Sequence, residues 1–381
     1  MKSYDIAIVG GGLIGASIAF ELAADKRQVI VLDRQQPGLE ASWAAAGMLS
    51  PAPDSAHDIP LVPLGMESLR LYPDYIGAIG EFSKQSPVYR RDGAIEVFAG
   101  PPGLREREER VAECERLGVA IEAIPIETAR QWEGAIGPTA TAAAWLPDEG
   151  TVEPRLLMAA VLEAARNRGV EIRANSEVTR LAIESGRCTG VLVGDERFGA
   201  DQVILAAGSF SSQLFSGVEA LAQLVPTRPV RGQMIRLRSD RQRLGRVLRS
   251  RNGYLVPRDD GRIVAGSTSE KAGFEKRVTA GGIRRILDNL LELAPSLADA
   301  EILETWSGLR PGTPDDLPIL GPSEVEGLLI ATGHYRNGIL LAAVTAKLIR
   351  EWITCGQTTF DAGRFSPLRF ADRRAEVQRA R

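Results

Sequence analysis

Glycines with a defined spacing stand near the amino terminus, in the turn GGGLIG at residues 10–15. Gly10 permits a tight turn, Gly12 lets a pyrophosphate approach the backbone, and Gly15 lets a helix pack closely on a strand. The amide groups at the start of that helix suit phosphate oxygens, and so does its dipole. Asp33 is placed to accept hydrogen bonds from ribose hydroxyls. The chemistry indicated is dinucleotide binding.

The segments around this turn complete the motif. Residues 6–9 predict a buried strand, residues 16–24 a helix, and residues 29–32 a second strand that ends at Asp33. A glycine turn alone is weak evidence, but here the strand, helix, second strand and terminal acid are all in register. The turn does not distinguish NAD from FAD, so that choice depends on the rest of the chain.

Composition excludes several classes of protein. The 381 residues carry a formal net charge of −3 and are 44% hydrophobic, so no basic excess points to a nucleic-acid partner. Apolar runs are interrupted before the roughly 20 residues of a membrane span, which predicts no integral membrane segment. The first strand begins too early to leave room for a signal peptide, so we expect a cytoplasmic protein.

Metal chemistry is not predicted. The three cysteines are widely spaced, and neither His57 nor His334 stands in a metal-binding frame. We therefore assign the chemistry to an organic cofactor.

Two later segments favour FAD. The small residues within 41–48, ASWAAAGM, offer backbone on which a flat ligand could lie, although a short helix is an alternative. Strands predicted at 177–183, 188–193 and 202–206 form a meander that stops at Ala207-Gly208. NAD dehydrogenases usually continue with strand–helix crossovers instead, whereas large FAD domains insert such a meander.

Four motifs resemble those of the FAD-dependent D-amino-acid oxidase superfamily, and within it the bacterial glycine oxidases tied to thiazole synthesis for thiamine. They are GGGLIG, AAAGML, GLRPGTPDDLPILG and GHYRNGILLA, and the last two are the most specific. The resemblance covers the chain from Tyr4 to about Trp352. It implies non-covalent FAD, because the cysteine of covalently flavinylated sarcosine oxidases has no counterpart after residues 311–316, and it implies a homotetramer.

The fold expected is α/β: a glutathione-reductase-type, FAD-binding Rossmann domain with an inserted antiparallel-sheet (α+β) substrate domain. Cofactor-type segments recur at the start, middle and end of the chain, so the chain must leave this domain and return to it. The predicted FAD-binding domain comprises 1–85, 148–220 and 310–366, and the substrate domain comprises 86–147 and 221–309. Residues 367–381 are expected to be a frayed tail.

The resemblance also implies the cofactor contacts. The fingerprint turn and Asp33, which is commonly Glu in relatives, would hold the adenosine end. Residues 46–48 would lie beside the flavin, and a helix starting at Gly338 would point its positive end at flavin N1 and the C2 oxygen. The residues predicted to bind FAD are Gly10, Gly12, Leu13, Ile14, Gly15, Asp33, Arg34, Ala41, Ser42, Ala46, Gly47, Met48, Val178, Ala207, Gly208, His334, Tyr335, Arg336, Asn337, Gly338, Ile339 and Leu340.

An amino-acid substrate needs a group that holds its carboxylate, and a bidentate guanidinium does this better than an ammonium group. By resemblance Arg310, in a predicted GLRPG turn, is the first choice, Arg336 is the second, and Tyr254 would donate its phenol from the opposite wall. No catalytic base is obvious. A neutral amine could assist hydride transfer to flavin N5 with its own lone pair, and we assign His334 to packing rather than to base catalysis.

The predicted activity is oxidative deamination of glycine and other small primary or secondary amines or D-amino acids. The imine would hydrolyse to glyoxylate or a 2-oxo acid with ammonia, and oxygen would become hydrogen peroxide. A dehydrogenase that passes electrons to a quinone or protein is the alternative, because residues 253–268 contain no lysine and sarcosine oxidases activate oxygen with one there. An FAD-binding module without amine chemistry is a second alternative.

Overall fold

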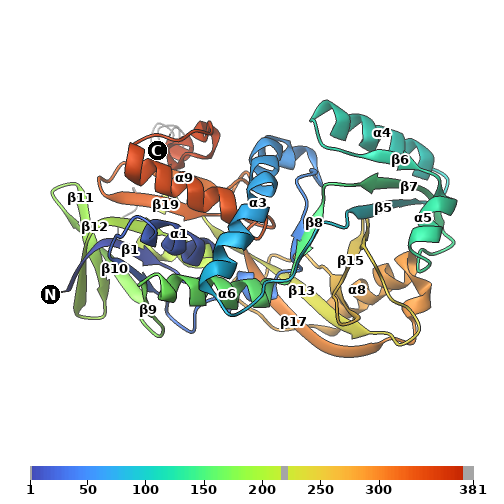
Figure 1. Ribbon diagram of the computed structural model, residues 1–381, viewed down its shortest axis with the longest axis horizontal. Coiled ribbons are helices and arrows are strands. Elements are labelled where there is room, and N and C mark those ends of the chain that lie inside the picture. The colour runs from blue at the N-terminus through green and yellow to red at the C-terminus, as the bar shows by residue number, and fades with distance from the viewer. Residues whose placement is uncertain (1, 216–221, 372–381) are drawn as a thin grey trace, which may run out of the picture.

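The computed structural model describes residues 2–215 and 222–371. Two sheets lie side by side (Figure 1). The first contains β1 and lies on the side marked N in Figure 1, the second contains β5 and β7 and lies on the other side, and helix α3 lies between them. This confirms the predicted fold class. The positions of the domain boundaries stay a prediction.

The first sheet is built on parallel strands around β1 (Lys2–Val9). That strand pairs with β2 (Val29–Leu32) on one side and with β12 (Glu196–Leu205) on the other. Apolar side chains occupy both faces of β1, as expected of a parallel strand covered on both sides. The remaining strands of this sheet are β9 (Glu171–Arg173), β10 (Val178–Glu184), β11 (Arg187–Val193), β18 (Ile319–Pro322) and β19 (Leu328–Thr332), and β10, β11 and β12 form the predicted antiparallel meander.

Helices cover one face of this sheet. The apolar helix α1 (Leu13–Ala23) packs against strands β1 and β2 and against helices α6 and α9, in a core that contains Ile8, Phe20 and Val31. Its first residue follows Gly12 directly, three residues earlier than predicted. The other helices of this layer are α3 (Val62–Phe82), α6 (Pro154–Asn167) and α9 (Ala342–Cys355).

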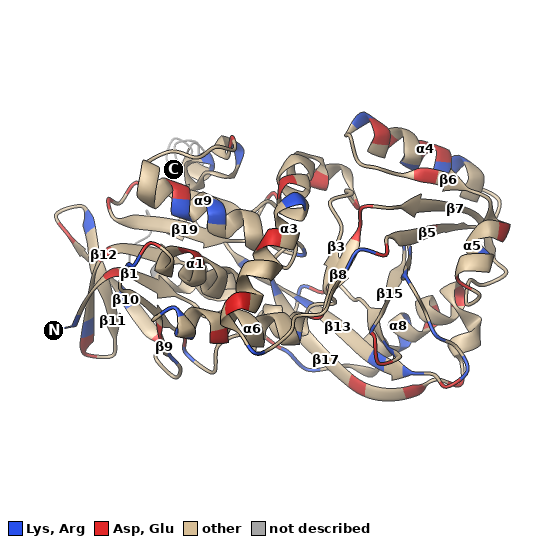
Figure 2. Cartoon of the chain, in the orientation of Figure 1, with Lys and Arg blue, Asp and Glu red and all other residues tan. Residues whose placement is uncertain are grey.

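The second sheet is mostly antiparallel and has the order β17-β13-β16-β15-β14-β5-β7-β6. Helices α8 and α5 cover one of its faces. Helix α4 packs against β5 and β7 on the other face. Basic and acidic residues alternate along α4 (Figure 2). The elements are β5 (Ala94–Ala99), α4 (Gly103–Arg116), β6 (Glu122–Ile124), α5 (Ile126–Trp132), β7 (Ala140–Leu146), β13 (Arg228–Arg238), β14 (Val247–Ser250), β15 (Gly253–Pro257), β16 (Arg262–Gly266), α8 (Ala280–Leu293) and β17 (Glu301–Gly312).

Short elements join the two sheets. Residues 41–48 predict either extended backbone for a flat ligand or a short helix. They contain both, since a one-turn helix precedes an extended segment. The prolines within residues 51–63 predict a loop, and the structure has a 3-10 helix inside this stretch. The elements are α2 (Ala41–Ala44), the 3-10 helix Ala56–Leu61, and a small sheet of β3 (Met48–Leu49), β4 (Tyr89–Arg90) and β8 (Gly150–Val152).

Three local predictions are wrong. The apolar spacing of residues 64–84 predicts a helix interrupted at Pro73, but helix α3 continues through this proline. Tyr72, Tyr75 and Ile79 bury its apolar face, so tertiary packing outweighs the proline. Arg310 lies on strand β17 rather than in a turn.

The third concerns the predicted tail, which is packed at its start. Phe370 is buried, and Arg369 forms an ion pair with Asp315 at 2.9 Å. Residues 372–381 of the predicted tail lie outside the described residues.

Candidate active site

A cavity of about 1700 Å³ runs between the two sheets. It is lined from the fingerprint turn and Asp33 at one end to Tyr254 and Arg310 at the other. Every residue predicted to bind FAD or substrate lines it except Gly15. A side chain at Gly15 would overlap the carbonyl oxygen of Gly10, so this glycine allows the close helix–strand packing that the sequence indicated.

The fingerprint turn leaves room for a ligand. Gly12 caps helix α1 without a side chain, and a Cβ atom built there would meet nothing closer than the Ser42 hydroxyl at 3.4 Å. The same hydroxyl accepts a hydrogen bond from the Leu13 amide at 2.9 Å. Gly10 has a φ of +104°, which only glycine adopts readily. Backbone groups at a helix amino terminus therefore face open space, as a pyrophosphate site requires.

Asp33 lies at the end of strand β2, and its carboxylate accepts hydrogen bonds from the amides of Gly11 at 2.8 Å and Gln35 at 3.0 Å. Burial raises the pKa of Asp33, although these two amide hydrogen bonds oppose the shift. The carboxylate has further lone pairs that can accept the predicted ribose hydroxyls. The two amide hydrogen bonds thus hold the Asp33 carboxylate beside the turn.

The returning segment 334–340 lines the middle of the cavity. Regular helix begins at Ala342, not at the predicted Gly338. The reason is that the carbonyl oxygens of Ile339 and Leu340 accept hydrogen bonds from Tyr72 at 2.9 Å and from Ser68 of helix α3. The Leu341 amide already donates to the Asn337 carbonyl at 2.8 Å, so one irregular helical turn precedes α9.

His334 is buried in this segment and contacts the Thr345 hydroxyl through Nε2 at 3.0 Å. Burial lowers its pKa to about 3, so the ring is neutral at neutral pH. A group with so low a pKa is a weak general base, which agrees with the packing role assigned from the sequence.

The opposite wall of the cavity is one row of side chains that crosses the second sheet. Met234 pairs with Gly266, Gly266 with Tyr254, Tyr254 with Arg249, and Arg249 with Glu96. Residues directly opposite one another on neighbouring strands point to the same face. Because Tyr254, Arg249 and Glu96 line the cavity, this face of the sheet is the one that faces the cavity.

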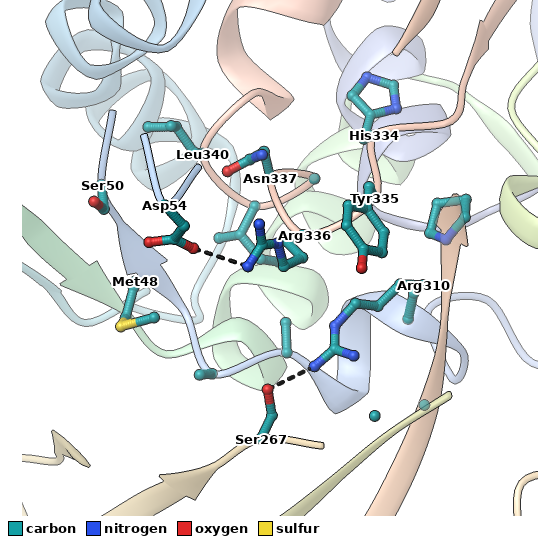
Figure 3. Close-up of a pocket in the computed structure, with 18 of the residues that line it drawn as sticks. Met48, Ser50, Asp54, Ser267, Arg310, His334, Tyr335, Arg336, Asn337 and Leu340 are labelled. Carbon is teal, nitrogen blue, oxygen red and sulfur yellow. Dashed lines mark hydrogen bonds and ion pairs between the residues drawn. The ribbon is translucent and has the colours of Figure 1, made fainter. Parts of the chain in front are cut away.

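Arg310 lies on the same face of strand β17, four residues after Trp306, which pairs with Met234. Its guanidinium donates to the Ser267 hydroxyl at 2.8 Å (Figure 3). It also donates to the Thr268 carbonyl at 3.0 Å. A side chain at Gly232 would overlap this guanidinium, so Gly232 makes the space in which it lies. No carboxylate pairs with Arg310 within residues 2–215 and 222–371.

The other predicted substrate residues have contrasting surroundings. Arg336 forms ion pairs with Asp54 at 2.9 Å and Asp58 at 3.2 Å, which tie it to the loop before α3 (Figure 3). The Tyr254 hydroxyl meets the thioether of Met234 at 3.4 Å, a weak acceptor that leaves the proton available for a better one. Of the two arginines, Arg310 is therefore the one whose charge is not already paired with an acid.

Sequence reasoning missed a buried charged cluster beside this row. Arg249 binds Glu96 at 2.9 Å and Glu149 at 3.1 Å, and Arg110 of α4 also binds Glu96. Burial disfavours the Glu96 carboxylate, but the two arginines outweigh it and hold its pKa below the usual range. Burial raises the pKa of Glu149. A lone glutamate within the apolar run 94–98 was the signal that could have revealed this cluster.

Trp43 does not line the cavity, although its neighbours Ser42 and Ala44 do. Its ring packs edge-to-face on Trp306, with centroids 6.2 Å apart, and Arg155 lies over it at 3.5 Å. Trp43 therefore contributes to the packing between helix α6 and strand β17 rather than to the pocket.

Known proteins resemble this chain over nearly its whole length. The bifunctional protein ThiO/ThiG of Synechocystis is 35% identical over 96% of the chain, which spans about half (54%) of that relative. Glycine oxidase of Pseudomonas putida is 32% identical, with 96% of this chain and 98% of the relative covered. The crystal structure of glycine oxidase from Geobacillus kaustophilus matches with a TM-score of 0.89 at 31% identity, covering 96% of this chain and 98% of that one.

The family model described as FAD dependent oxidoreductase matches residues 5–352, which include every part of the cavity wall described above. This confirms the family resemblance drawn from the motifs. The chain belongs to the DAO family of FAD-dependent oxidoreductases.

Proposed function

We propose that this chain oxidises glycine and other small primary or secondary amines or D-amino acids. The observation that carries the proposal is Arg310, a guanidinium held by Ser267 and Thr268 at the cavity wall with its charge left for a substrate. A bidentate pair with an amino-acid carboxylate is the interaction that such a group favours. The names of the glycine oxidase relatives support the choice of substrate.

The residues would position the substrate rather than exchange protons with it. Arg310 and Tyr254 would bind the carboxylate from two strands of one sheet, which orients the α-carbon toward the cofactor side of the cavity. Bound FAD supplies the hydride acceptor. Because His334 is neutral and contacts Thr345, the substrate amine would enter the reaction through its own lone pair.

Anaerobic mixing with glycine, sarcosine and D-alanine tests the proposal, with bleaching of the flavin as the readout. The variant Arg310→Ala should keep bound FAD but lose about a hundredfold or more in reduction efficiency, because a buried charge pair costs roughly 3 kcal/mol to break. Arg228→Ala is the matched control, since Arg228 is exposed on the neighbouring strand β13. Equal reduction of both variants would contradict the assignment of Arg310.

A dehydrogenase is the second candidate. Strands β15 and β16 and the two residues that follow them contain no lysine, the group that sarcosine oxidases use for oxygen activation. Reoxidation of the substrate-reduced enzyme should be followed in air, with peroxide measured, and then with a soluble quinone. Peroxide in one equivalent per turnover favours the oxidase, and fast reoxidation by the quinone alone favours the dehydrogenase.

Three other predictions remain proposals. No helix in the described part of the chain is both long and apolar enough to cross a membrane. We propose a cytoplasmic enzyme and a tetramer, the latter from the resemblance alone. A role in thiamine synthesis rests on the names of the ThiO/ThiG relatives.

A further inference from the structure

The segment 267–279 joins strand β16 to helix α8 and spans the two ends of the cavity. We call it the strap. It has no regular secondary structure, but its described contacts reach both the substrate arginine and the cofactor domain.

The first end of the strap is anchored in the substrate sheet. Ser267 and Thr268 hold Arg310, as described above. Glu270 exchanges two backbone hydrogen bonds with Arg231, each 2.9 Å long, and its carboxylate also binds the Arg231 side chain. The strap therefore leaves the substrate sheet from a fixed position.

The second end of the strap reaches the first sheet through a ring. Phe274 stacks on Phe210, with centroids 4.8 Å apart and planes inclined by 29°. The guanidinium carbon of Arg34 lies 3.4 Å from the centroid of the same Phe210 ring. The guanidinium and the second ring cannot share one face at these distances, so Phe210 is sandwiched between them.

An ion pair lies next to this stack. Lys276 donates to the carboxylate of Glu40 at 3.1 Å. Glu40 in turn accepts hydrogen bonds from Arg34 at 2.8 Å and from the Gln35 side chain at 2.9 Å. Both groups that hold Arg34, the Phe210 ring and the Glu40 carboxylate, are thus held by the strap.

Arg34, Glu40 and Phe210 line the adenosine end of the cavity. We propose that Phe274 and Lys276, although they come from the other sheet's domain, act as positioning residues for the adenosine half of FAD. They keep Arg34 in place beside the cofactor, and FAD leaves when this end of the strap detaches. The proposal deepens the FAD site and does not depend on which amine is oxidised.

The solvent exposure of Phe274 distinguishes a role in holding FAD from a role in folding. Phe274 is 42% exposed, so its ring adds little to the hydrophobic core, and its contacts are with the cofactor domain. Leu291 on helix α8 is similarly exposed, at 38%, and does not line the cavity. It offers a matched control for loss of an exposed apolar side chain from the same domain.

The experiment measures FAD release from the holoenzyme, by the rise of flavin fluorescence after dilution, together with the dissociation constant from titration of the apoprotein with FAD. For Phe274→Ala we expect release to be about three- to tenfold faster, the size of an aromatic pair. For Lys276→Ala we expect FAD release to be about two- to threefold faster than in the parent protein. This difference in release rate should shrink at high salt.

Leu291→Ala and Arg241→Ala are the controls, the second because Arg241 is 84% exposed and pairs with Asp299 far from the strap. Release rates of the strap variants equal to those of the controls would overturn the proposal. So would a loss of apoprotein stability in Phe274→Ala with unchanged FAD release, which would assign the ring to folding. No amine is present in these measurements, so a failure of amine oxidation would leave their result standing.

Discussion

The two ends of the cavity are built in different ways. The proposed adenosine end is shaped mainly by backbone, since Gly10 and Gly12 lie in the turn between β1 and α1 and Gly15 lies in the first turn of α1. The substrate end is made of side chains from separate strands, with Arg310 on β17 and Tyr254 on β15. Added atoms should therefore impair FAD binding at the adenosine end. Lost or displaced polar groups should impair amine binding at the substrate end.

The largest effect is expected at the adenosine end, for Gly15→Ala. The new Cβ would overlap the Gly10 carbonyl oxygen, so helix α1 must move away from the turn. We expect the purified protein to contain almost no FAD and to unfold with a free energy lower by roughly 1–3 kcal/mol.

Gly77→Ala is the control for this substitution, because a Cβ there would meet nothing within 4 Å on the exposed side of α3. It should keep FAD and gain up to about 1 kcal/mol in stability. Absorbance spectra and urea unfolding check both variants. Full FAD content in Gly15→Ala would show that the turn is less constrained than its geometry indicates.

The next largest effect is expected for Gly232→Ala, at the substrate end. The added methyl group would displace the Arg310 guanidinium without changing any charge. We expect FAD content to be unchanged and the KM for the amine to rise about tenfold or more, since displacement weakens a charge-assisted pair by roughly 2 kcal/mol. Steady-state kinetics and flavin absorbance measure both. Loss of FAD instead would mean that the two ends are not separable.

At the cofactor side, His334 is a side chain, rather than backbone, whose burial affects stability. We expect this effect to depend on pH. Its pKa falls from 6.5 in the unfolded chain to about 3 because of burial, so protons bind the unfolded chain more strongly. The stability that this ring contributes is complete above pH 6.5 and is lost as the pH falls toward 3, by up to about 1.4 kcal/mol per pH unit. Urea unfolding at pH 7 and pH 5 should show a smaller difference in His334→Gln than in the parent protein. Parallel pH dependences would mean that the ring is not buried in solution.

The smallest effect is expected for Tyr254→Phe. The ring stays in its row on the sheet, and only the hydroxyl that faces Met234 is lost. One hydrogen bond of about 1 kcal/mol corresponds to a roughly fivefold rise in KM, with FAD content unchanged. Tyr89→Phe is the control, because Tyr89 lies outside the cavity and its buried hydroxyl has no hydrogen-bond partner within the described residues. An unchanged KM for Tyr254→Phe would remove this residue from the substrate site.

The strand, turn and helix of the proposed adenosine end could be predicted from the sequence because their signals are local. The glycine spacing, the flanking strands and Asp33 lie within one short segment, and each glycine has a steric reason that spacing alone reveals. The fold class was predicted correctly for the same reason, since the meander and the returning strand are also local patterns.

The contacts that hold the side chains of the proposed substrate end could not be predicted from local sequence patterns. Arg310 is held by Thr268, 42 residues earlier in the chain, and by the space above Gly232. Arg110 lies in the charged run 105–110, whose pattern predicts a solvated helix face. It nevertheless donates to Glu96 and to the Pro53 carbonyl. Such contacts depend on how distant strands align, which local periodicity does not encode.

The final strand and helix complete the first sheet, since β19 pairs with β12 and α9 packs on α1. This arrangement has a consequence for biosynthesis. The fingerprint turn leaves the ribosome long before residues 334–340, which line the same cavity, have been made. Pairings of such long range also form slowly. Cofactor capture should therefore be a late event in the life of the nascent chain, so stalled or truncated translation products would carry the motif without its ligand.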